Sequence, residues 1–263
     1  MRPYWAMLSA RFRTLLQYRA AALAGFGTQL FFGVVIVMTY QAFYSANTTP
    51  QPMSLEHVVS YIWLGQALFA LMPWAPDADI RLLIRTGGVA YELLRPVNVY
   101  WLWFSRALAR RTAPTVLRSI PMFITAMLLL GLQPPASLAS GLAWGMATVC
   151  AVLLASAIAT IFGIGMIWTI SGEGLHRLVS PLVMLLSGML IPLPLMPAWS
   201  QTFLRVLPFR GLADIPFRLY LGDIPPSSVG PMLLHQLTWV ALLALFGHWL
   251  LSRAMRRLVV QGG

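Results

Sequence analysis

The sequence predicts an all-α membrane protein with six transmembrane helices. Fifty-nine per cent of the 263 residues are hydrophobic and only 10% are charged. A water-soluble domain of this size cannot bury so much apolar surface, so lipid is the expected solvent. The apolar residues also gather into six runs, each near the ~20 residues that cross a bilayer. We place these spans at roughly 21–43, 57–76, 113–132, 138–169, 177–196 and 229–251, and treat 1–263 as a single transmembrane domain.

The stretch before the first span, residues 1–20, is predicted to be an amphipathic helix lying at the membrane interface. Trp5, Leu8 and Phe12 recur at helical spacing on one side, and Arg13 and Gln17 lie on the other. Such a pattern is typical of helices in the headgroup region. A plain basic flank to the first span is the alternative. The apolar run that follows is too long for a secretory signal, so we expect it to be retained.

Two spans have features that predict irregular helices. The fourth is long enough to tilt or to project beyond the bilayer, and a break is expected, if anywhere, near Gly163 and Gly165. The fifth ends in SGMLIPLPLMPAW at 187–199, where Pro192, Pro194 and Pro197 remove three backbone donors. We therefore expect a broken outer segment over 187–226, with a short amphipathic or re-entrant helix after residue 198.

Arginine placement predicts the orientation in the membrane. All 18 basic residues are arginines, against seven acidic residues, giving a net charge of +11. These arginines cluster at span ends and not on one solvated face, so the charge does not indicate nucleic-acid binding. The positive-inside rule makes the arginine-rich side, with both termini, cytoplasmic. Fifteen lie on that side: Arg2, Arg11, Arg13, Arg19, Arg81, Arg85, Arg95, Arg106, Arg110, Arg111, Arg118, Arg177, Arg253, Arg256 and Arg257.

The longest cytoplasmic connection, residues 77–112 between spans 2 and 3, is predicted to hold a short helix. A Gly87–Gly88 turn precedes a helix candidate from Val89 to Leu94, which closes before Pro96. The alternative is a basic loop whose aromatic residues anchor it at the interface; these are Tyr100, Trp101 and Trp103.

Catalytic chemistry is not expected in this chain. It contains no lysine, and a P-loop ATPase needs one to contact the nucleotide phosphates. There is no HExxH zinc motif, no pair of intramembrane aspartates, and only one cysteine, Cys150. His235 and His248 are isolated on the sixth span, where a histidine most often bonds a neighbouring helix. We therefore predict no catalytic residue, metal site or cofactor site.

A coupling ion also has no expected binding site within the spans. All seven acidic residues fall at span ends or in loops, and the sequence shows no inverted repeat. Secondary transporters need ionisable or polar groups near the midplane, so that class is disfavoured. A six-helix bundle without its own energy source needs a partner that supplies one.

The layout resembles the ABC-2 type exporter permeases, in the bacterial branch grouped with daunorubicin-resistance-like and viologen-exporter permeases. The resemblance rests on the N-terminal amphipathic segment, the loop IRTGGVAYELLRPVN at 84–98 and the broken segment at 187–199. The loop is the most specific part, since that family places a glycine shortly before LLRP between its second and third spans.

This resemblance implies a transmembrane subunit of an ATP-driven exporter that forms half of the export pathway. The loop would be a coupling helix that docks on a separate ABC ATPase, present in two copies, which would bind the ATP and magnesium. The implied docking residues are Gly88, Tyr91, Glu92, Leu94 and Arg95. The resemblance also favours a second, different permease chain over a homodimer, surrounded by membrane lipid.

The same resemblance implies an export path lined by the first, second and fifth spans. Gln29, Trp63 and Gln66 are its pathway candidates, although each residue type also serves as an interhelical hydrogen bond or interface anchor. Pro192, Pro194 and Pro197 would belong to an outer gate. The alternative function is a non-transporting membrane scaffold or assembly protein, which would need no docking loop.

Overall fold

In the computed structural model, residues 2–47, 49–74, 77–169 and 173–255 are described, and every regular element among them is a helix. In chain order, the elements are α1 (Arg2–Leu16), α2 (Arg19–Ala46), α3 (Leu55–Ala67), η1 (Phe69–Leu71), α4 (Ala78–Arg85), α5 (Val89–Leu93), α6 (Val99–Leu129), α7 (Leu138–Thr169), α8 (Glu173–Leu186), η2 (Leu193–Leu195), α9 (Ala198–Val206), η3 (Pro208–Gly211), α10 (Asp214–Leu221), η4 (Pro226–Ser228) and α11 (Val229–Met255).

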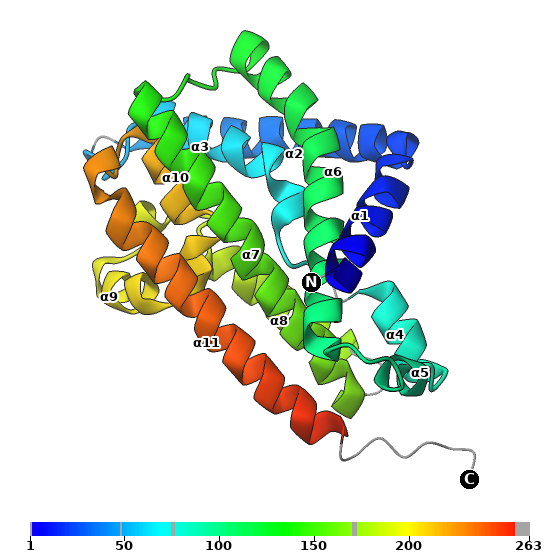
Figure 1. Cartoon of the computed structure of the whole chain (residues 1–263). Helices are drawn as coiled ribbons and strands as arrows, with labels where there is room; N and C mark the ends of the chain where they lie inside the picture. The colour runs from blue at the N-terminus through cyan, green and yellow to red at the C-terminus, as the bar shows by residue number, and fades with distance from the viewer. Residues whose placement is uncertain (1, 48, 75–76, 170–172, 256–263) are drawn as a thin grey trace.

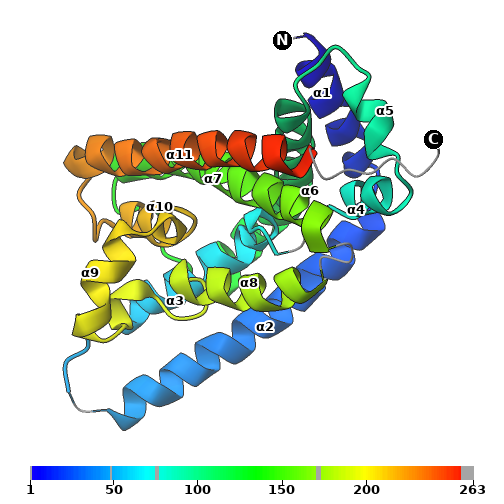
Figure 2. The ribbon, with the colours of Figure 1, turned by 90° about the horizontal axis from the view of Figure 1, so that it is seen from below.

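Two long helices, α7 and α11, lie side by side along the molecule (Figures 1 and 2). Small residues such as Ala147 and Ala151 are fully buried on α7, and they let neighbouring helices approach closely. Gln236 of α11 donates from Nε2 to the Ala147 carbonyl at 2.9 Å, and it is also fully buried. This pair forms one side of a bundle whose other side is built around α6.

The long helix α6 packs against α1, α2, α3 and α7 (Figure 1). Its contact with α3 is fixed by Trp63, whose indole N–H donates to the Leu130 carbonyl at 2.9 Å. By contrast, α2 lies at the edge of the bundle and buries only four residues, among them Gln29 and Gly33. Most of the apolar surface of α2 is therefore free to face lipid or another chain.

Among the residues that the structure describes, four helices are long and apolar enough to cross a membrane: α2, α6, α7 and the stretch from Pro226 through α11. They account for the first, third, fourth and sixth predicted spans. The second and fifth predicted spans correspond to shorter helices, α3 and α8, of 13 and 14 residues. At 1.5 Å per residue each is about 20 Å long, which is less than the ~30 Å hydrocarbon core.

The predicted loop over 77–112 is wrong in its second half, because α6 begins at Val99 and not near residue 113. Pro114 and Pro121 lie inside this helix, and three arginines precede them. Charged residues are uncommon inside transmembrane helices and proline removes a helical hydrogen bond, which is why the sequence indicated a loop here. Asn98 provides the helix start, since its side chain accepts a hydrogen bond from the Trp101 backbone N–H at 3.3 Å.

Two further boundaries differ from expectation. The fourth span has no break at Gly163 or Gly165, because α7 runs without interruption from Leu138 to Thr169. The fifth span ends at Leu186, ten residues before the predicted limit, and Gly188 then adopts a φ of +84°. The prediction that no continuous helix crosses 187–199 is confirmed, since only η2 and the start of α9 lie there.

The molecule has two distinct ends, best seen in Figure 2. One end carries α1, α4 and α5, and we call it the α4–α5 end. The opposite end carries α9 and the loops near α10, and it is held by polar contacts between distant segments. The Tyr220 hydroxyl of α10 donates to the Gln133 carbonyl at 2.9 Å, and His57 Nδ1 lies 2.8 Å from Asp223 Oδ1.

Candidate functional site

The α4–α5 segment, residues 77–98, is a compact projection joined to the start of α6. Asp77 caps α4 by accepting from the Asp79 backbone N–H at 2.9 Å. Gly87 ends the following turn with a φ of +72°, a left-handed conformation that glycine adopts at no steric cost. Val89 is fully buried against α6 residues such as Tyr100 and Trp103, so α5 is packed and does not hang free.

Glu92 fixes the orientation of α5. Its carboxylate accepts from the Trp103 indole N–H at 2.6 Å and pairs with the Arg106 guanidinium. The Glu92 and Arg106 side chains are only 5% and 10% exposed. A buried charge pair of this kind is costly to break, because removing one partner leaves the other charged in an apolar site.

The predicted docking residues separate into two groups. Tyr91 and Leu94 are 74% and 81% exposed, and Arg95 is also exposed. Together they form what we call the α5 tip. Gly88 is half-buried, and a Cβ there would lie 3.0 Å from Leu83 Cδ2. Glu92 points inward instead, so its side chain supports the tip and does not extend it.

The first helix is attached to the same end. Arg11 pairs with Asp79 and lies 3.8 Å from Asp77, and the Asn98 backbone N–H donates to the Tyr4 hydroxyl at 3.0 Å. Residues 2–16 are helical as predicted, but none of them is fully buried. The interfacial position expected from the amphipathic pattern remains a prediction.

The three pathway candidates lie in the packed layer between α2 and α3. Gln29, Trp63 and Gln66 are 4%, 1% and 7% exposed. A Cβ on Gly33 of α2 would overlap the Trp63 ring, so the glycine permits this close approach. Gln29 Oε1 is buried without a hydrogen-bond partner among the described residues. In this conformation the three side chains contact neighbouring helices, not an open channel.

The prolines of the outer segment mark the starts of short helices. Pro192 precedes η2, and Pro197 precedes α9. Pro194 lines a hollow of about 350 Å³ together with Arg205 and Arg218. Proline at these positions costs no intrahelical hydrogen bond.

The outer segment also contains a buried charge cluster that the sequence did not reveal. Asp214 is 1% exposed, and its Oδ2 atom lies 3.6 Å from Arg210 Nη2 and 3.8 Å from Arg218 Nη1. Burial raises the pKa of Asp214, and the two arginines oppose that effect. Burial also lowers the pKa of Arg210. The i, i+4 spacing of these three residues is the one signal that could have predicted the cluster.

Within the described residues no group of three or more potential metal ligands occurs. The candidate functional features described above are the α5 tip, the α2–α3 layer and the outer segment.

The comparisons with known proteins agree with this membrane architecture. The family model described as ABC-2 family transporter protein matches residues 28–262. No curated protein and no solved structure matches the chain. The family match covers most of α2, the other three long apolar helices, the α4–α5 segment and the outer segment. This chain therefore belongs to the ABC-2 family of transporters, as a transmembrane component.

Proposed function

We propose that the chain is the transmembrane subunit of an ATP-driven ABC exporter, forming half of an export pathway and driven by a separate ATPase. The observation that carries this proposal is the α5 tip. It exposes Tyr91, Leu94 and Arg95 while a buried ion pair keeps its base rigid. A rigid, partly apolar projection is what a docking surface requires, because little ordering entropy is lost on binding.

The proposed topology has six crossings with both termini cytoplasmic in a bacterial inner membrane. The two short helices are extended at their ends, α3 by η1 and α8 by the loop that leads to η2. In support, the predicted cytoplasmic segments α1, α4 and α5 share one end of the fold, and α9 lies at the other (Figure 2). The 3₁₀ helices that follow α3 and α8 are partly buried in protein, as at Leu71 of η1 and Leu193 of η2. Buried sites of this kind are where departures from the α-helix are tolerated at membrane depth.

Coupling is proposed to pass from α5 into α6. Glu92 connects α5 to Trp103 and Arg106, which lie on the second and third turns of α6. The whole of α6 is 31 residues long, and it packs against α1, α2, α3 and α7. A displacement of the α5 tip by ATP-driven closure of two ATPase subunits would therefore tilt α6. The tilt would shift the population between inward-facing and outward-facing arrangements.

The export path is proposed to form when α2 moves relative to α3. Gln29, Trp63 and Gln66 are enclosed between these helices now, and separating the helices at Gly33 would expose them. The exposed apolar face of α2 is available for a second permease, which we propose to be a different chain. The outer segment that contains Pro192, Pro194 and Pro197 would close the exit.

A co-purification experiment tests the proposal. The chain would be expressed with its genomic neighbours, purified in mild detergent through a tag, and the co-eluting proteins identified. We expect a P-loop ATPase to co-elute with the wild type and to be lost from Leu94→Ser. Leu138→Ser is the matched control, because Leu94 and Leu138 are 81% and 84% exposed on different parts of the fold.

Failure of any ATPase to co-elute with the wild type, under conditions that keep other ABC complexes intact, would contradict the exporter proposal. A non-transporting scaffold would then be the better account. Equal retention by Leu94→Ser and the wild type would instead place the docking surface elsewhere.

A further inference from the structure

A basic hollow lies between α1, the η1 region and α6, away from the α5 tip. Its volume is about 380 Å³. Apolar side chains form most of its lining, and the charged groups all come from α6. The three charged residues are Arg110, Arg111 and Arg118.

Two of these arginines, Arg111 and Arg118, form no ion pair among the described residues, although Asp77 acts on Arg111 electrostatically. Arg111 is 4% exposed; its Nη1 donates to the Ala107 carbonyl at 3.0 Å, and its Nε has no partner. Arg118 reaches only the Ala21 carbonyl, at 3.4 Å, and its Nε is also buried and unpaired. Arg110 lies 3.5 Å from Asp77, which also lies near Arg11. The hollow thus carries an excess of positive charge, because three arginines line it and the nearby carboxylate of Asp77 is shared with Arg11.

An oxyanion would relieve this charge. Arginine presents fixed N–H donors that match phosphate and carboxylate oxygens, and such charge-assisted bonds are stronger than neutral ones. Arg111 and Arg118 are seven residues apart and therefore lie on the same face of α6, two turns from each other. Pro114 lies between them on α6 and also lines the hollow.

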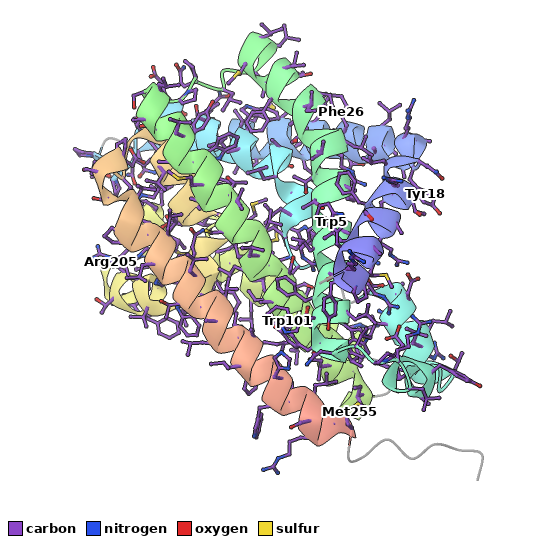
Figure 3. The ribbon with its side chains drawn as sticks, in the orientation of Figure 1. Trp5, Tyr18, Phe26, Trp101, Arg205 and Met255 are labelled. Carbon is purple, nitrogen blue, oxygen red and sulfur yellow. The ribbon has the colours of Figure 1, made fainter. Side chains whose placement is uncertain are left out.

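The hollow continues into a groove that becomes apolar. A second hollow, lined by Tyr18, Ala22 and Leu117, shares Leu15, Pro114 and Arg118 with the first. Asp79 also borders this second hollow, and it is paired with Arg11. Figure 3 labels Tyr18 and Phe26, two aromatic residues that flank the groove.

A third hollow, of about 230 Å³, shares Ala22 and Leu117 with the second and extends along α2 and α6 to Phe26 and Pro121. Its lining is apolar except for Arg19 at one end. A groove that is basic where the first two hollows meet and apolar along the third fits a molecule with an anionic head and a hydrocarbon tail. Basic pockets between helices on the cytoplasmic side are suited to anionic lipid headgroups.

We infer that the groove between α1, α2 and α6 binds an anionic phospholipid, with its phosphate at Arg111 and Arg118 and an acyl chain along Leu117, Phe26 and Pro121. The site is separate from the α5 tip and does not depend on the chain being an exporter. Free phosphate shares the same headgroup chemistry, so the experiment compares the two sources directly.

The test uses the full-length chain, purified in neutral detergent and stripped of lipid. Native mass spectrometry and thermal unfolding would follow titration with dioctanoyl-phosphatidylglycerol, dioctanoyl-phosphatidylcholine and inorganic phosphate. We expect phosphatidylglycerol to bind and to raise the melting temperature, with little effect from the other two. Arg111→Gln/Arg118→Gln should weaken phosphatidylglycerol binding about 10- to 100-fold, because two charge-assisted contacts are lost.

The control Arg2→Gln/Arg253→Gln removes the same charge from exposed arginines outside the groove, and it should bind as the wild type does. Leu117→Trp fills the apolar part of the groove and keeps both arginines, so it tests the acyl contact if the double variant does not fold. It should weaken phosphatidylglycerol binding and leave any phosphate binding unchanged.

Three results would overturn the inference. One is equal binding of phosphatidylglycerol and phosphatidylcholine. Another is tight inorganic phosphate binding that displaces phosphatidylglycerol, together with phosphatidylglycerol binding that Leu117→Trp does not weaken. The third is wild-type lipid affinity in the Arg111→Gln/Arg118→Gln variant.

Discussion

Replacing Glu92 by alanine should release α5 from α6 without unfolding the bundle. The Glu92 and Arg106 side chains are 5% and 10% exposed, and Trp103 Nε1 lies 2.6 Å from the same carboxylate. Removing one partner of a buried pair costs about 3–5 kcal/mol, because the remaining charge is uncompensated. Since α5 lies at the end of the fold, we expect it to swing out and let water solvate Arg106, which limits the damage to the α4–α5 segment.

Amide hydrogen exchange measures this release. The backbone N–H groups of Ala90 and Tyr91 bond to the carbonyls of Gly87 and Gly88, both at 3.1 Å, so they report on α5 directly. A loss of 3–5 kcal/mol corresponds to exchange that is faster by a factor on the order of 10² to 10³, up to the limit set by the open loop. Amides in α7 should keep their wild-type protection.

Two matched variants control for the removal of a carboxylate. Glu92→Gln keeps an acceptor for the Trp103 indole and should show a smaller change. Glu56→Ala removes an exposed carboxylate at the start of α3 and should leave exchange in α5 unaltered. Unchanged exchange over residues 87–98 in Glu92→Ala would refute the reasoning, as would an equal loss of protection in α7.

Two further predictions concern the bundle itself. Gly33→Leu should lower the free energy of unfolding by about 1–3 kcal/mol in a thermal unfolding assay, because the added side chain meets the Trp63 ring. Gly27 lies on the same helix with no atom near its Cβ position, so Gly27→Leu should leave the free energy of unfolding unchanged in that assay. A raised Asp214 pKa means that folding favours its neutral form, so this contribution to stability is present at acidic pH and is lost as pH rises through the folded pKa. Melting temperatures recorded between about pH 4 and 7 should therefore fall less with rising pH in Asp214→Asn than in the wild type. The same pH dependence in both proteins would contradict a raised Asp214 pKa.

The sequence predicted those parts of the fold that depend on local periodicity and composition. The apolar runs of α2, α7 and α11 appear where expected, because each exceeds a bilayer thickness and carries few charges. The short helix α5 was also predicted, from the glycine turn before it and Pro96 after it. In each case the signal lies within the element itself.

The features that sequence reasoning missed depend on contacts between distant residues. The first 14 residues of α6 looked like a loop because they carry Arg106, Arg110 and Arg111, yet Glu92 and Asp77 compensate two of these charges from other elements. The inward orientation of Glu92 could not be read from its position between Tyr91 and Leu94. A carboxylate in a short amphipathic helix is ordinarily solvated, and only its partners reveal the difference.

The central claim, that the α5 tip docks on an ATPase, is tested most directly by site-specific cross-linking in the assembled complex. The chain has one cysteine, Cys150, which is buried and can be replaced by serine, so a cysteine introduced elsewhere reports alone. Leu94→Cys should cross-link to a P-loop ATPase, with a yield that changes on ATP addition, whereas Leu138→Cys should give no such product. An intact complex in which Leu94→Cys fails to cross-link, or cross-links no more than Leu138→Cys, would contradict the account.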